Sequence, residues 1–155
     1  MFKYFCAIPI IFSSYCIAVE NNNDRGLYRD NNYNVLALAG QYTCGVYSLP
    51  NDASDSSKYN DIKVGTAKAE VTPDMSDNSV LIYIDLGTGV KITTPRMPLV
   101  KKGSEMTTYL SESKGGLFAY LVSESYGWNA LVQSKDKGSE VSIRLADCKY
   151  DKSSN

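Results

Sequence analysis

The sequence predicts an all-β protein: a small antiparallel barrel or a two-sheet sandwich of about eight strands in largely meander order. From residue 35 onward, short runs rich in Val, Ile, Tyr and Thr alternate with clusters of Gly, Asn, Asp, Ser and Pro. This pattern is typical of strands separated by turns. No window of helical length places apolar residues at the three-four spacing of an amphipathic helix.

Eight segments have the composition of strands, and we predict strands at residues 35–48, 62–71, 79–86, 90–94, 106–111, 117–123, 128–133 and 141–146. Short turns join most of them: a Gly-Thr-Gly hairpin follows the third strand, and glycine-containing turns separate the last four, as in a meander. Two longer connections, 49–60 and 95–105, interrupt this order. Closing the sheet, as a barrel or a sandwich, limits the adhesive edges that an open sheet would leave.

Alternation along three of the strands assigns a core face. The predicted core residues are Val80, Ile82, Ile84 and Leu86, then Leu117, Ala119 and Leu121, then Val141, Ile143 and Leu145. Two of these strands are also apolar on the other face, through Leu81 and Tyr83 and through Phe118, Tyr120 and Val122. A strand that is apolar on both faces is covered on both sides or presents one face to a ligand or partner. The connection 95–105 is one candidate cover, and a ligand cavity or a partner surface is the alternative.

The N-terminus has the pattern of a secretory signal peptide at residues 1–18. Lys3 precedes an apolar stretch too short to cross a bilayer as a helix, and small residues stand before a cleavage site after Ala18. Residues 19–34 are polar and without periodicity, which predicts a flexible segment. We therefore expect one β domain at residues 35–149, a polar tail at 150–155, and a mature protein that is secreted or periplasmic.

Removal of the signal leaves two cysteines, Cys44 and Cys148. In an exported chain, two cysteines predict a disulfide, which here ties the first predicted strand to the end of the last. Cys44 shares strand parity with Tyr42, on an inward face, whereas Cys148 is opposite in parity to Leu145. We therefore expect a bulge near residues 146–147 and a bond at the rim of the domain.

The composition excludes several chemistries. The chain contains no histidine, which removes Ser-His-Asp and Cys-His catalysis and the common imidazole-based zinc sites. A formal net charge of −1 provides no strong field for binding nucleic acid. Loop carboxylates such as Asp52, Asp55 and Asp61 match no calcium motif, and calcium binding there stays open. We expect no catalytic residues, no metal, no cofactor, no nucleic-acid partner and no stable membrane insertion after signal cleavage.

Aromatic residues are the remaining candidates for function. The tentative binding residues are Phe118, Tyr120, Tyr126 and Trp128, around one predicted hairpin, together with Tyr83. Tyrosine and tryptophan combine apolar area with a polar tip, which suits protein and small-ligand sites, although aromatic residues are also ordinary strand residues. Tyr126 falls in a predicted turn, where burial is least expected, so it is the first residue to test.

These observations favour an exported, non-catalytic binding module that engages a protein partner, of the inhibitor, immunity or host-interaction kind. A lipocalin-like carrier of a small apolar ligand is the alternative, and an enzyme of unrecognised type is third. A carrier requires an internal apolar cavity ringed by Tyr and Phe. A protein binder requires a filled core and an exposed aromatic patch.

The residues around the two cysteines resemble a known frame. Tyr42-Thr43-Cys44 and Asp147-Cys148-Lys149 are similar to the ends of small periplasmic lysozyme inhibitors, where a Y-x-C is disulfide-bonded to a cysteine after the last strand of a β-barrel. The resemblance implies a barrel, the same disulfide and an inhibitory protein contact. The family's S-G-x-x-x-Y inhibitory loop has no clean counterpart in this sequence. Gly40-Gln41-Tyr42 also resembles the Gly-x-Trp that opens lipocalin-type barrels.

Overall fold

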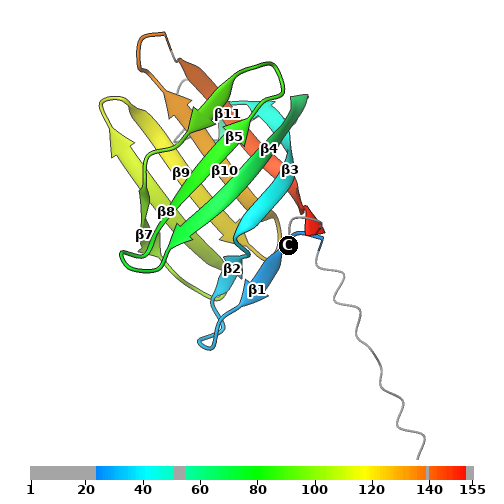
Figure 1. Cartoon of the computed structure of the whole chain (residues 1–155), viewed down its shortest axis with the longest axis vertical. Helices are drawn as coiled ribbons and strands as arrows, with labels where there is room; N and C mark the ends of the chain where they lie inside the picture. The colour runs from blue at the N-terminus through cyan, green and yellow to red at the C-terminus, as the bar shows by residue number, and fades with distance from the viewer. Residues whose placement is uncertain (1–23, 51–54, 139, 153–155) are drawn as a thin grey trace, which may run out of the picture.

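The described part of the protein, residues 24–50, 55–138 and 140–152 of a computed structural model, is built almost entirely of β-strands (Figure 1). The elements are β1 (Leu27–Arg29), β2 (Val35–Ala37), β3 (Gly40–Ser48), the 3-10 helix η1 (Ser56–Lys58), β4 (Lys63–Asp74), β5 (Ser79–Asp85), β6 (Lys91–Thr93), β7 (Met97–Lys101), β8 (Met106–Ser113), β9 (Gly116–Ser123), β10 (Gly127–Ser134) and β11 (Val141–Tyr150). The predicted all-β class is confirmed. The predicted signal peptide lies outside the described residues.

The large sheet closes on itself. Its strands follow the order β4-β3-β11-β10-β9-β8-β7-β5-β6, and an additional pairing of β4 with β5 completes a ring. Every pairing in it is antiparallel. The strands of the ring therefore succeed one another in chain order, with the short β6 pairing only to β5. Of the two predicted architectures, the protein adopts the barrel in meander order.

Three local features differ from the predicted strands. The predicted strand 35–48 is two strands, because the chain turns at residues 38–39 and Gly40 takes a positive φ of 126°. The predicted connection 95–105 contains β7, which is part of the ring and not a cover over it. The segment before residue 35, where no strand is predicted, carries β1, which pairs with β2.

The interior of the barrel is filled by apolar side chains, and here one predicted core face is reversed. Val80, Ile82 and Ile84 of β5 are buried in the core as predicted, and so is Leu145 of β11. In β9, however, the core side chains are Phe118, Tyr120 and Val122, whereas Leu117 and Leu121 face outward. The ladder with β10 sets this, because it places these three residues opposite Val132, Ala130 and Trp128. Both faces of β9 are apolar, so alternation alone does not choose between them.

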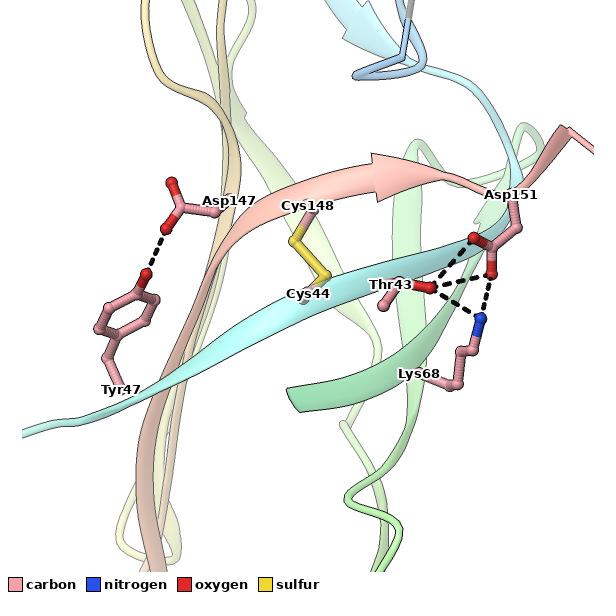
Figure 2. Close-up of a disulfide and its surroundings, with 7 residues drawn as sticks. All are labelled: Thr43, Cys44, Tyr47, Lys68, Asp147, Cys148 and Asp151. Carbon is pink, nitrogen blue, oxygen red and sulfur yellow. Dashed lines mark hydrogen bonds and ion pairs between the residues drawn. A yellow bond between two sulfur atoms is a disulfide. The ribbon is translucent and has the colours of Figure 1, made fainter. Parts of the chain in front are cut away.

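The disulfide joins the first and last strands of the ring, as predicted (Figure 2). The register between β11 and β3 shifts between Ala146 and Lys149, and Asp147 has a positive φ of 51°, so the expected bulge is present. The bulge turns Cys148 inward, toward Cys44. Both cysteines are buried in the core, and Cys44 is central in β3, so the bond does not lie at an exposed rim.

Polar contacts secure the strands on both sides of this bond (Figure 2). Lys68 of β4 forms an ion pair with Asp151 at 2.7 Å, and Thr43 of β3 donates a hydrogen bond to the same carboxylate at 3.0 Å. The Lys68 ammonium holds the pKa of the Asp151 carboxyl below its usual range. On the other side, Tyr47 donates a hydrogen bond to Asp147, next to the bulge. The seam between the two ends of the chain is thus tied covalently and electrostatically.

The hairpin of β1 and β2, which we call the N-terminal hairpin (residues 27–37), lies at the lower end of the barrel in Figure 1. Val35 is buried there: its N–H donates to Gly103 O at 3.0 Å, and its carbonyl accepts from Thr107 Oγ1 at 2.7 Å. Lys102 and Asp30 add an ion pair at 2.8 Å. These contacts hold the hairpin against the end of the barrel.

Candidate functional site

Three of the five predicted binding residues point into the barrel. Phe118, Tyr120 and Trp128 are 9%, 2% and 1% exposed. The rings of Tyr120 and Trp128 pack together with Tyr42: the centroid of Trp128 lies 5.1 Å from that of Tyr42 and 5.4 Å from that of Tyr120. These residues therefore belong to the core and form no part of an external aromatic patch.

The other two predicted residues are on the surface, far apart. Tyr126 lies in the turn between β9 and β10 and is 80% exposed. Tyr83 lies on β5, points outward and is 48% exposed. In the ring, β5 and β10 are opposite one another, four strands apart in either direction. The structure does not bring Tyr83 and Tyr126 together.

Tyr126 lines a groove of about 320 Å³ on the outside of the barrel, which we call the outer groove. The lining residues are Ser56, Tyr59, Met106, Leu121, Ser123, Tyr126, Gly127, Asn129, Leu131 and Arg144. The outward side chains of β8, β9 and β10 supply an apolar base through Met106, Leu121 and Leu131. The groove is thus an apolar surface with aromatic residues on it.

The residues at and just after η1 form one wall of the outer groove through Ser56 and Tyr59. The Asp55 side chain accepts a hydrogen bond from the N–H of Ser57 and caps η1. After η1, the ring of Tyr59 lies beside the Arg144 guanidinium, whose central carbon is 5.7 Å from the centroid of the ring. Arg144 also hydrogen-bonds to the Asn60 carbonyl at 3.4 Å and pairs with Asp61 at 3.3 Å. One arginine on β11 therefore anchors this wall.

Arg144 itself is held between tyrosines. The guanidinium also lies over the ring of Tyr47, with its central carbon 4.7 Å from the ring centroid. Such cation–π contacts add about 0.5–2 kcal/mol, depending on solvation. The Nε atom of Arg144 is buried and has no hydrogen-bond partner among the described residues. Arg144 is the only charged side chain among the described residues that line the outer groove, so the groove presents no acid–base pair.

Sequence reasoning identified Tyr126 but missed the groove around it. Leu121 is predicted for the core, because the parity of β9 is read the wrong way, and its outward position follows from the ladder with β10. Tyr59 lies in a connection with no periodic signal, and only the folded chain places it beside Arg144. The apolar character of both faces of β9 is the sequence signal that indicates an external apolar surface at this position.

The acidic loops do not assemble into a recognisable metal centre within the described residues. No group of three or more His, Cys, Asp or Glu side chains suited to a metal ion occurs there. Asp52 lies outside that part of the chain, whereas Asp55 caps η1 and Asp61 pairs with Arg144. Also within the described residues, no helix has the length and apolar character needed to span a membrane.

Comparison of the chain with protein-family models, with curated proteins and with solved structures finds no significant match. Function is therefore argued from the fold and from the geometry of the surface.

Proposed function

We propose that this is an exported, non-catalytic binding protein that engages a protein partner through the outer groove. The observation that carries the proposal is Tyr126, a large aromatic residue that stands 80% exposed beside an apolar groove of about 320 Å³. Aromatic residues are enriched where protein partners meet.

The shape of the outer groove favours a protein partner over a small molecule. Small-ligand sites commonly bury about 70–90% of the ligand surface. A wall whose most prominent residue, Tyr126, is largely in solvent cannot enclose a ligand to that extent. A side chain or loop of another protein, in contrast, covers Tyr126 as it enters the groove, and the apolar base of Met106, Leu121 and Leu131 receives its apolar part.

Export is supported by the disulfide and by the predicted signal peptide. Disulfides form and persist in oxidising compartments and are rare in reducing ones. The Cys44–Cys148 bond therefore fits a protein that acts outside the cytoplasm. A non-catalytic role is supported by the described lining of the groove, in which Arg144 is the only charged residue and is engaged in contacts with the groove wall.

The test is affinity capture followed by quantitative binding. The full-length protein, purified in its oxidised form, is immobilised and exposed to an extracytoplasmic fraction, and any retained protein is purified for titration. We expect Tyr126→Ala and Leu131→Asp to weaken binding at least about tenfold, as loss of a central aromatic or apolar contact does. Tyr33→Ala is the matched control, because Tyr33 is also a highly exposed tyrosine in a turn but lies outside the groove.

Equal affinity of the wild type, Tyr126→Ala and Leu131→Asp for the purified partner would place the contact elsewhere and refute the proposal. Equal loss in Tyr33→Ala would do the same, since that variant leaves the groove intact.

A further inference from the structure

A second pocket, of about 190 Å³, lies where the N-terminal hairpin meets the barrel; we call it the end pocket. On one side it is lined by residues of the hairpin and the chain that follows it, including Tyr28, Leu36 and Leu38. On the other side it is lined by core residues of the barrel, which are Val71, Val80, Tyr120 and Val122. The end pocket therefore reaches from the surface to the buried interior of the barrel.

One polar group at the inner wall of this pocket lacks a partner. The hydroxyl of Tyr120 is buried and has no hydrogen-bond partner among the described residues. Its neighbour in the core, Tyr42, is satisfied, because its hydroxyl donates to Leu38 O at 2.7 Å. An unsatisfied buried hydroxyl is costly, and such groups in native proteins call for an explanation. Because Tyr120 is one of the residues that line the end pocket, a molecule bound there would supply the missing acceptor once a small shift of the wall uncovers the buried hydroxyl.

The charges around the end pocket are already neutralised. The two lining residues with full charges are Asp74 and Lys102, and within the described residues each has an opposite partner: Arg96 at 2.7 Å and Asp30 at 2.8 Å. Burial raises the pKa of the Tyr109 and Tyr120 hydroxyls, so both stay neutral donors at physiological pH. An ionic ligand would give up its hydration here without meeting a free counter-charge, which is strongly unfavourable.

Size and lining define the rest of the ligand. An apolar cavity of about 150 Å³ accommodates benzene, so the end pocket suits a single ring with one small substituent. Its walls combine aliphatic side chains with the rings of Tyr28, Tyr109 and Tyr120. We propose that the end pocket binds an uncharged, compact molecule of about this size, with an apolar body and one hydrogen-bond acceptor that Tyr120 recognises.

Three probes of the same number of non-hydrogen atoms separate these requirements. Acetophenone offers a ring and an acceptor, isopropylbenzene offers a ring with a substituent of similar size but no acceptor, and benzoate carries a charge. Binding is followed by NMR of the full-length protein through the indole N–H of Trp128, the only tryptophan in the chain, whose ring lies beside Tyr120. We expect acetophenone to bind about three- to tenfold more tightly than isopropylbenzene, as one hydrogen bond provides, and benzoate not to bind measurably.

Tyr120→Phe tests the recognition directly. We expect it to abolish the preference for acetophenone while leaving the affinity for isopropylbenzene nearly unchanged. Leu36→Trp, which fills the pocket from the hairpin side without changing the barrel interior, should block all binding. Tyr33→Phe, at an exposed tyrosine that lines neither the end pocket nor the outer groove, is the control and should alter nothing.

Each outcome decides a part of the proposal. If none of the probes shifts the Trp128 signal, or if Leu36→Trp leaves binding intact, the end pocket is not the site. If benzoate binds best, or if the wild type and Tyr120→Phe show the same preference, the ligand class is wrong. Neither failure affects the outer groove, since the two sites share no lining residue.

Discussion

Replacement of both disulfide cysteines, as Cys44→Ala/Cys148→Ala, should lower the free energy of unfolding by about 4–6 kcal/mol. The two cysteines are 104 residues apart in the chain. For a loop of about that length, the chain-entropy model assigns about 4.7 kcal/mol to the constraint that the bond places on the unfolded state. Loss of two buried sulfur atoms from the core adds roughly 1 kcal/mol, as deletion of a buried methyl group does.

The folded structure should survive this change. Strands β3 and β11 remain paired on both sides of the bond, from Ile143 opposite Ser48 to Tyr150 opposite Tyr42. The ion pair of Lys68 with Asp151 holds the same seam. The free energy of unfolding therefore falls mainly because the unfolded chain gains conformational entropy. The native circular dichroism spectrum should not change.

The measurement is urea unfolding, followed by circular dichroism and by the emission of Trp128. For a chain of this size the predicted loss corresponds to a fall in Tm of roughly 8–24 °C. The m-value should rise, because the uncrosslinked denatured chain is more expanded. Wild type unfolded in the presence of a reducing agent is the control and should approach the double variant. A loss below about 1 kcal/mol with an unchanged m-value would refute the reasoning, since the bond would then not restrict the unfolded chain.

Two further predictions concern the turn into β9 and the N-terminal hairpin. Gly116→Ala should destabilise the protein by more than about 2 kcal/mol in a urea titration, because Gly116 has a φ of 152° and an added Cβ would lie 2.0 Å from the carbonyl oxygen of Gln133. Gly65→Ala is the control: an added Cβ there has no atom within 4 Å, so the variant should be neutral or slightly stabilising. Equal effects of the two substitutions would contradict this prediction. The hydrogen bond from Lys102 holds the pKa of the Asp30 carboxyl well below its usual value of about 3.9. A depressed folded-state pKa contributes stability that is present above the unfolded pKa and lost as the pH falls below it, so wild type should lose more stability than Asp30→Asn between pH 7 and roughly pH 3. Identical losses measured by urea unfolding at the two pH values would show that the ion pair does not stabilise the folded state.

The strands bounded by clear turns are largely predictable from the sequence, and the exceptions have physical causes. β5 alternates between Val80, Ile82 and Ile84, and its position and core face are both correctly predicted. β7 is not predicted, because it contains Pro98, which lowers the expectation of a strand. In the folded chain Pro98 is accommodated, since β7 pairs with β5 over only two residues and then with β8. Such tolerance depends on neighbours that are distant in sequence.

The candidate sites are less predictable than the fold, because each depends on which face of a strand turns inward. The aromatic residues of β9 and β10 are identified from composition, but the register between these strands decides that they enter the core. The exposure of Tyr126 does not depend on which face of a strand turns inward, because this residue lies in a turn. The outer groove and the end pocket, in contrast, are assembled from segments far apart in the chain, and no local pattern indicates either of them.

The position of Trp128 decides how the binding proposal can be tested. The sequence predicts that Tyr126 and Trp128 belong to one patch, and on that prediction the variant Tyr126→Ala/Trp128→Ala would remove it. The structure separates them: Trp128 is buried, and Trp128→Ala would cost about 3–5 kcal/mol by leaving a cavity in the core. That is a large share of the stability of a typical domain. Lost binding in Tyr126→Ala/Trp128→Ala would therefore not distinguish a removed contact from a partly unfolded protein. Tyr126→Ala alone, checked for an unchanged unfolding free energy, is the variant that isolates the contact.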